Sequence, residues 1–123
     1  MNIILDTHIF LWVLAEPERL NQKYLKYIEN LSNEIFVSSI SIAEIAIKKS
    51  IGKLNFNFEI DKVIRNSGFE PLDFSVEDAT ELMRLPLSHK DPFDRMIIAQ
   101  GISNNYYIIS DDDKFKLYSC KLL

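Results

Sequence analysis

Asn2-Ile3-Ile4-Leu5-Asp6-Thr7 joins a short apolar run to an acid and a hydroxyl residue. A continuous apolar run of this length is typical of a strand that is buried on both faces of a parallel sheet. Asp6 follows the run directly and can cap a helix over residues 8–15, which Pro17 interrupts. The chain therefore opens with a strand and a helix that meet at an acidic corner.

The alternation of strand and helix patterns continues to the end of the chain. Apolar runs predict strands at residues 34–38, 69–72 and 106–110 and a last edge near 120–123. Helical spacing and end signals predict helices over 20–32, 40–50, 59–66, from 76 to about 85, and from 92 onward. Such alternation implies right-handed crossovers, so we expect an α/β fold in three layers, with a mostly parallel central sheet flanked by helices.

Length and composition are those of one ordinary domain. With 123 residues and 47% hydrophobic content, residues 1–123 can form one core without disulfides. The single cysteine, the absence of any apolar run of roughly 18 residues and the lack of a signal-peptide pattern predict a cytoplasmic protein without a membrane segment. The net charge of −4 argues against simple binding of polyanions, but not against nucleic acid bound through cations that acids hold.

Acids recur where predicted strands end and helices begin. Asp6 and Asp112 follow strands, while Glu44 and Asp94 lie near the starts of helices. Because the carboxyl ends of parallel strands meet at one edge of a sheet, we expect four carboxylates around one crevice. Clustered like charges raise pKa values or recruit a counter-ion, and oxygen ligands without paired Cys or His indicate Mg²⁺ or Mn²⁺.

Taken singly, each acid also has an ordinary structural explanation. Asp6 and Asp91 can cap helices, and Asp94 can complement a helix dipole. Glu44 can pair with Lys48, and the run 111–113 can be a solvated turn. These explanations do not account for the collection of like charges at one edge.

Other chemistries lack their sequence signals. His8, His89 and Cys120 have no spacing typical of a zinc site, which favours packing, surface or supporting roles for them. No Gly-x-Ser-x-Gly motif and no phosphate-binding glycine loop is present. A response-receiver domain would need adjacent acids after the first strand, where this chain has Asp6 followed by Thr7.

Four blocks of the sequence resemble the PIN-domain ribonucleases and, within that family, the VapC-type toxins of type II toxin-antitoxin systems. In chain order, nearly end to end, these blocks are residues 4–8, 38–45, 89–100 and 108–115. The resemblance implies that the catalytic acids and metal ligands are Asp6, Glu44, Asp94 and Asp112. The residue before the fourth acid is usually basic or polar in the family, but here it is Asp111, so Asp111 remains an alternative to Asp112.

The resemblance implies a Mg²⁺- or Mn²⁺-dependent endoribonuclease that hydrolyses RNA phosphodiester bonds and leaves a 5′-phosphate. It further implies a toxin that acts on structured RNA such as tRNA, forms a homodimer and is held by a cognate antitoxin. A catalytically inactive PIN-like module for RNA binding or protein interaction is the alternative.

Three further groups of residues receive supporting roles. Residues that can orient carboxylates or bound waters, with local capping as the alternative, are Thr7, Ser110, Asp91 and Asp111. Basic residues that can contact RNA, with solvated helix faces as an equal alternative, are Lys48, Lys49, Lys53 and Arg95. Large apolar residues that can form an antitoxin groove or a dimer face, or else ordinary core, are Phe10, Trp12, Phe56 and Phe58.

Overall fold

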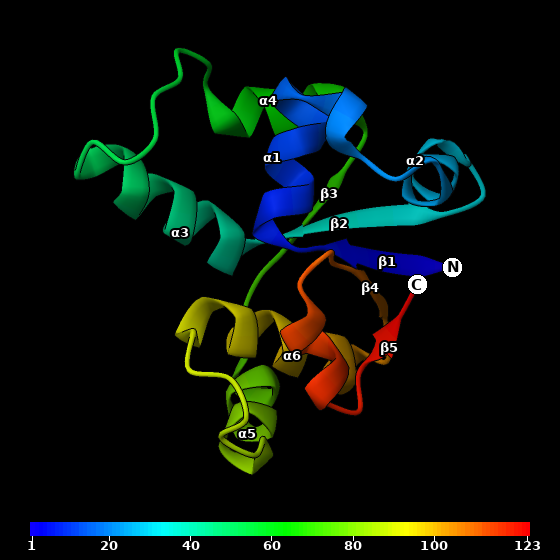
Figure 1. Ribbon diagram of the computed structural model, residues 1–123, viewed down its shortest axis with the longest axis vertical. Coiled ribbons are helices and arrows are strands. Elements are labelled where there is room, and N and C mark those ends of the chain that lie inside the picture. Colours follow the sequence, from blue (N-terminus) through cyan, green and yellow to red (C-terminus); the bar gives the residue numbers. More distant parts are fainter.

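A five-stranded sheet lies between two layers of helices in the computed structural model, which describes residues 1–123 (Figure 1). The strands are β1 (Asn2–Leu5), β2 (Glu34–Ser38), β3 (Glu70–Leu72), β4 (Tyr107–Ile109) and β5 (Lys121–Leu122). Their order is β3-β2-β1-β4-β5, and every neighbouring pair is parallel. The predicted α/β fold with a parallel sheet flanked by helices is therefore confirmed.

Six α-helices and two short 3-10 helices connect the strands. They are α1 (Thr7–Ala15), η1 (Pro17–Arg19), α2 (Gln22–Glu29), α3 (Ser39–Ser50), α4 (Ile60–Ser67), α5 (Val76–Arg84), α6 (Pro92–Asn104) and η2 (Asp113–Leu117). None of these helices is long and apolar enough to cross a membrane.

The predicted helix over 20–32 is too long at both ends. The Asn21 side chain accepts a hydrogen bond from the Lys23 backbone N–H, and α2 begins at Gln22, two residues later than expected. At the other end, the Asn30 side chain accepts from the Ser32 N–H, which forms a turn in place of further helix. Capping side chains therefore decide where α2 begins and ends, although the spacing of its apolar residues predicts a longer helix.

Alternate side chains of β1 supply the two layers. Ile3 and Leu5 belong to a buried cluster that also includes residues of α1, α3 and α4. Ile4 belongs to a second cluster on the opposite face, with residues of α6 and η2. Figure 1 shows α1 and α4 on one side of the sheet and α5 and α6 on the other. A strand buried on both faces is what the continuous apolar run predicts.

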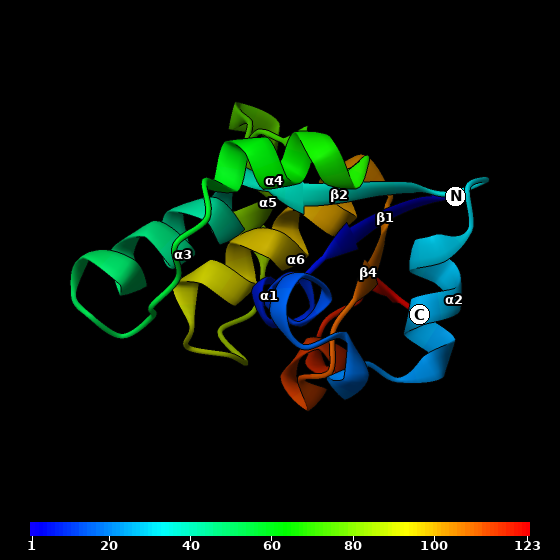
Figure 2. The same cartoon turned by 90° about the horizontal axis from the view of Figure 1, so that it is seen from above.

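The strand register brings three chain corners to one edge of the sheet. Leu5 of β1 pairs with Val37 of β2 and with Ile109 of β4. The next residues along these strands, Asp6 and Ser110 among them, therefore lie side by side. Figure 2 shows α3 extending from this end of the sheet, away from both chain termini.

Candidate metal centre

Asp6 is a buried acid between two donors. Its Oδ1 accepts the Ile9 backbone N–H at 2.8 Å, so Asp6 caps α1, and its Oδ2 accepts the Ser110 hydroxyl at 2.5 Å. Burial raises the pKa of this carboxyl from 3.8 to about 6, although both hydrogen bonds act in the opposite direction. Asp6 is thus the expected helix cap. Its buried negative charge is unfavourable, and a bound cation would offset that cost.

Glu44 is buried with one oxygen paired and the other alone. Its Oε2 forms an ion pair with Lys48 Nζ at 2.9 Å, as the helical spacing predicts. Its Oε1 is buried without any hydrogen-bond partner, and the side chain is only 5% exposed. An unpaired buried carboxylate oxygen costs roughly 1–3 kcal/mol, which the lysine alone does not offset.

Asp94 lies in the first turn of α6. Asp91 caps this helix by accepting hydrogen bonds from the backbone N–H groups of Phe93 and Asp94, as predicted. Asp94 Oδ2 accepts a hydrogen bond from His89 Nε2 at 2.8 Å. The pKa of Asp94 is raised, mainly by burial and further by the charges of Asp91 and Glu44.

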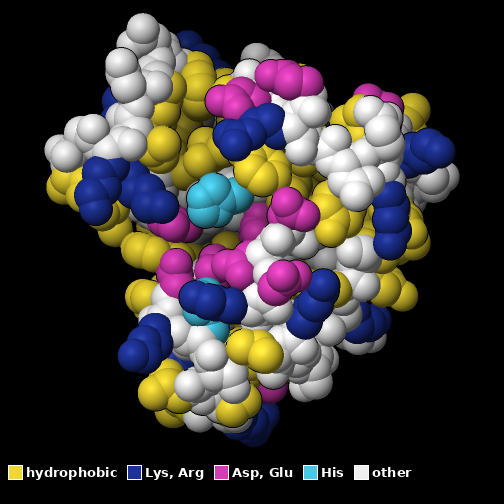
Figure 3. Space-filling model, in the orientation of Figure 1, with side chains coloured by type: hydrophobic (Ala, Val, Ile, Leu, Met, Phe, Trp, Pro, Cys, Tyr) yellow, Lys and Arg dark blue, Asp and Glu magenta, His cyan; other side chains and the backbone are white.

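The four predicted acids lie near one another at this edge of the sheet. The charge of Asp94 contributes to the raised pKa of Asp6, and that of Glu44 contributes to the raised pKa of Asp94. Asp112 completes the group, because His89, Asp94 and Asp112 each offer a ligand atom within 4.8 Å of the others. Figure 3 shows Asp and Glu side chains gathered in the middle of this face, with His side chains beside them.

Asp111 and Asp112 differ in their surroundings. Both are exposed and line a cavity of about 240 Å³ together with Asp6. Asp112 also caps η2 through the Lys114 N–H, and it belongs to the cluster with Asp94, whereas Asp111 does not. This difference favours Asp112 as the fourth acid.

The predicted supporting hydroxyls have different partners. Ser110 donates to Asp6, as expected, and its hydroxyl also accepts the Asp112 N–H. Thr7 does not hold a carboxylate, because its hydroxyl donates to the buried Ser41 hydroxyl at 3.0 Å. Thr7 therefore ties α1 to α3 and does not hold a carboxylate, and its predicted role toward bound water stays a prediction.

The four candidate RNA-binding residues are not equally free. Lys48 pairs with Glu44, and Lys49 donates to the Phe56 carbonyl with its Nζ 4.2 Å from the Phe56 ring centroid. Lys53 is exposed and forms no ion pair. Arg95 donates to the Leu85 carbonyl, and its Nε is buried without a partner, so it lies against the end of α5 and not along an open surface.

The large apolar residues divide between core and surface. Phe10 is fully buried core. Trp12, Phe56 and Phe58 line a groove of about 330 Å³ that also contacts His8, next to the acids. Trp12, Phe56 and Phe58 thus form a groove, whereas Phe10 is ordinary core; that the groove binds an antitoxin or a second copy stays a prediction.

His89 lies beside one of the acids, which agrees with the supporting role that the sequence leaves open for it alongside packing and surface roles. It is 6% exposed and contacts Asp94 directly. No periodicity or metal-ligand spacing marks it, because the contact forms across the cap that Asp91 and Pro92 build.

A hard divalent cation fits these residues. Two buried carboxylates, Asp6 and Glu44, and the partly buried Asp94 converge, the unpaired Oε1 of Glu44 lacks a donor, and no thiol takes part. Mg²⁺ and Mn²⁺ bind to oxygen ligands of this kind.

Comparisons with known proteins agree with the fold. A family model for the PIN domain matches residues 3–119. The chain is 30% identical over 122 residues to Ribonuclease VapC22 of Mycobacterium tuberculosis (strain ATCC 25618 / H37Rv), covering 93% of this chain and 89% of that protein.

Two solved structures show the same fold. VapBC2 from Rickettsia felis, bound to a DNA fragment from their promoter, matches with a TM-score of 0.75 and 20% identity over 100% of this chain and 98% of that chain. DNA-bound VapBC from Salmonella typhimurium matches with a TM-score of 0.72 and 16% identity over 100% and 97%. On the extent of the family match, the chain belongs to the PIN domain family.

Proposed function

We propose that this protein is a divalent-metal-dependent endoribonuclease and the toxin of a type II toxin-antitoxin pair. The observation that carries the proposal is the buried acidic centre, in which Glu44 Oε1 has no partner within the protein. The relative named Ribonuclease VapC22 and the fold shared with VapBC complexes support it. We further propose that residues 1–123 are a single PIN domain and that structured RNA such as tRNA is the substrate.

Asp6, Glu44, Asp94 and Asp112 are the residues that would hold Mg²⁺ or Mn²⁺. Such a cation supplies Lewis acidity, which activates water and neutralises the charge of a phosphodiester. Ser110 keeps Asp6 Oδ2 in place, and Lys48 keeps Glu44 Oε2 in place. With water activated by the cation as the nucleophile, we expect hydrolysis that leaves a 5′-phosphate and a 3′-hydroxyl.

The antitoxin would bind in the groove beside the acids. Trp12, Phe56 and Phe58 offer apolar surface there, and Phe56 and Phe58 stack with ring centroids 4.4 Å apart. A segment with apolar side chains that fills this groove would also cover the acidic centre, because Thr7 and Lys48 lie at the shared border. Binding and inhibition would then be one event.

Cleavage of total RNA with mapping of 5′ ends tests the enzymatic proposal. Wild type with Mg²⁺ or Mn²⁺ should produce discrete new 5′-phosphate ends, and chelation should abolish them. Asp6→Asn and Asp94→Asn should each abolish cleavage. Asp61→Asn on α4 is the matched control, because Asp61 is exposed and pairs only with Arg65, and it should cut like wild type.

The outcome separates the two functional classes. If folded wild type cuts nothing with either metal, or if both variants at the acids cut normally, the catalytic reading fails. An RNA-binding or protein-interaction module without catalysis would then be the better description. The mapped ends identify the RNA and the bond in the opposite case.

A further inference from the structure

We propose that His89 is a positioning residue of the metal centre, which fixes the Asp94 carboxylate through a hydrogen bond from its ring. The inference rests on the proposed function, since Asp94 is one of the proposed metal ligands. It adds a residue outside the four acids and gives it a defined task.

The hydrogen bond leaves one oxygen of Asp94 for a cation. His89 Nε2 lies 2.8 Å from Asp94 Oδ2. An ionised carboxylate only accepts hydrogen bonds, so the hydrogen is assigned to Nε2. Asp94 Oδ1 accepts no hydrogen bond within the protein. The ring therefore holds one oxygen and leaves the other without a protein partner, in a cluster where His89, Asp94 and Asp112 each offer a ligand atom within 4.8 Å of the others.

The core holds His89 itself in place. Its backbone N–H donates to Tyr118 Oη at 2.9 Å, and Tyr118 belongs to the buried cluster under α6. On the other side, the Asp91 cap fixes the start of α6. His89 is therefore anchored from two directions and lies buried, so its ring has little freedom to leave Asp94.

At Asp6 and Glu44, the two buried acids of the centre, a side chain likewise holds one carboxylate oxygen, although the second oxygen of Asp6 also accepts the Ile9 backbone N–H. Ser110 donates to one oxygen of Asp6, and Lys48 donates to one oxygen of Glu44. Each buried acid thus has one oxygen held by a side chain from outside the acid set. Hydrogen bonds of this type orient metal ligands, and their loss typically costs roughly 10- to 100-fold in metal affinity.

Calorimetric titration of the full chain with Mn²⁺ tests the proposal. We would compare wild type, His89→Gln and His89→Leu after complete removal of metal. Gln keeps an N–H donor at similar reach, whereas Leu keeps bulk and removes the donor. We expect His89→Leu to lose roughly 10- to 100-fold in Mn²⁺ affinity and His89→Gln to stay within a few-fold of wild type. Thermal unfolding in chelator checks that each variant is folded.

The outcomes separate this inference from the proposed function. If wild type binds no Mn²⁺, the metal-dependent function and the positioning role both fail. If wild type binds and His89→Leu binds equally well, or if the two variants lose affinity equally, only the positioning role fails. Nitrogen coupling of a coordinated imidazole in the electron spin-echo spectrum of bound Mn²⁺ would make His89 a ligand and also overturn it.

A second variant covers the case in which His89→Leu does not fold. Tyr118→Phe removes the hydroxyl that accepts the His89 N–H and leaves the ring of Tyr118 in the core. We expect a smaller loss of Mn²⁺ affinity, by several-fold, because His89 keeps its donor but loses one anchor. Unchanged affinity in folded Tyr118→Phe would contradict the proposed anchoring.

Discussion

At the scale of single residues, the centre combines charges that the fold itself makes unfavourable. Asp6, Glu44 and Asp94 are buried or half-buried, and two of them have raised pKa values because of burial. Water would solvate these charges better than the protein does. The cost of burying these three carboxylates is explained if the metal-free protein holds them in place for a cation to bind.

The raised pKa of Asp6 predicts a pH dependence of stability in the metal-free protein. The folded state binds a proton more tightly than the unfolded state, whose pKa is the ordinary 3.8. The free energy of unfolding should therefore fall as pH rises from about 4 to about 6 and stay level above that. Two pKa units correspond to about 3 kcal/mol, which is an upper limit for this group.

Urea unfolding in chelator between pH 4 and 8 measures this dependence. Asp6→Asn should lose the part of the decline that Asp6 causes and keep the part that comes from Asp94, whose pKa is also raised, while the exposed control Asp61→Asn should keep all of it. Parallel profiles for wild type and Asp6→Asn would contradict the role assigned to burial of Asp6.

Saturating Mn²⁺ should stabilise wild type above pH 6 but not Asp6→Asn, because binding to the folded state alone adds stability.

The ion pair of Glu44 and Lys48 predicts a coupled effect on stability. Lys48→Met leaves Glu44 buried with both oxygens unpaired, so we expect a loss of roughly 1–3 kcal/mol in chelator. In the Glu44→Gln background the same change should cost much less, because the buried charge is gone. Urea unfolding of the four proteins measures the coupling, and equal costs in the two backgrounds would show that the pair is not coupled.

The sequence predicts the positions of the acids better than it predicts which residues form hydrogen bonds with them. Asp6 and Ser110 are found because they follow strands whose register brings them together. The sequence leaves His89 between packing, surface and supporting roles, because its position depends on Tyr118, which is 29 residues later in the chain. Contacts that depend on packing between distant segments leave no local pattern.

At the scale of elements, most helix and strand limits follow from local signals. The capping box of Ser75 and Asp78 begins α5 at the predicted residue 76, and the left-handed Gly68 ends α4 one residue beyond the predicted 66. The contacts made by the interior of α6 are harder to predict from the sequence. Gln100 is fully buried, accepts a hydrogen bond from Ser38 and donates to the Leu72 carbonyl, so it joins α6 to β2 and β3. Its polar side chain gives no sign of this in the sequence.

The contact between α6 and β4 predicts that Gly101 tolerates no side chain. A Cβ at this position would lie 2.5 Å from Ile108 Cδ1 and 2.9 Å from Cγ1, and Ile108 is fully buried. Gly101→Ala gains up to about 1 kcal/mol of helix propensity, but overpacking costs roughly 1–3 kcal/mol. We expect a net loss of about 1 kcal/mol, measured by urea unfolding.

Ile108→Val is the matched partner for this test, because it removes the atom nearest to the added methyl group. The double variant should be more stable than the sum of the two single changes predicts. Strict additivity would mean that the helix and strand separate slightly and that the contact is not the cause.

At the scale of the whole molecule, one exposed apolar face has no partner within the chain. Val76 and Met83 lie seven residues apart on α5, and they are 79% and 80% exposed. Leu87, just beyond the helix, is 75% exposed. An apolar stripe of this kind on α5 is consistent with the homodimer that we expect from the family resemblance.

Light scattering over a range of concentrations tests the dimer. Wild type should have the mass of two chains, and Met83→Asp combined with Val76→Asp should have the mass of one. Leu31→Asp is the control, since Leu31 is fully exposed in the turn before β2 and outside this stripe. A double variant that remains dimeric would move the dimer contact to another surface.

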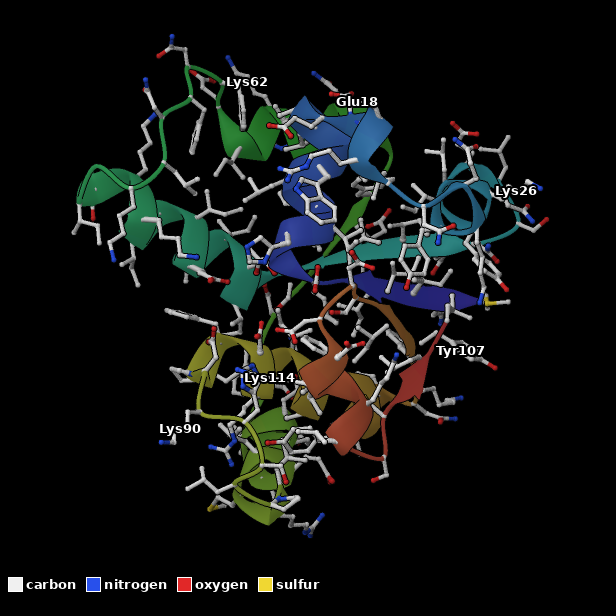
Figure 4. The ribbon with its side chains drawn as sticks, in the orientation of Figure 1. Glu18, Lys26, Lys62, Lys90, Tyr107 and Lys114 are labelled. Carbon is white, nitrogen blue, oxygen red and sulfur yellow. The ribbon has the colours of Figure 1, made fainter.

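The charge distribution of the whole molecule sets the terms on which RNA can bind. The net charge of −4 and the acidic centre repel a polyanion, so attraction must come from cations near the centre. Lys53 is exposed and unpaired at the end of α3, the helix that carries Glu44, whereas Lys26 on α2 projects from the rim of the molecule (Figure 4). Each phosphate contact with single-stranded RNA contributes about 0.7 to the slope of log affinity against log salt.

Lys53→Ala should therefore reduce the salt dependence of kcat/KM, measured on a synthetic RNA that spans the mapped cleavage site, by about 0.7. The effect should appear in KM, with kcat unchanged, because Lys53 lies outside the acidic centre and a phosphate contact there stabilises substrate and transition state equally. Lys26→Ala should leave the slope unchanged, since its charge is remote from α3. Equal slopes for wild type and Lys53→Ala would mean that RNA does not follow α3, and that the cations opposing the acids are the metal ions themselves.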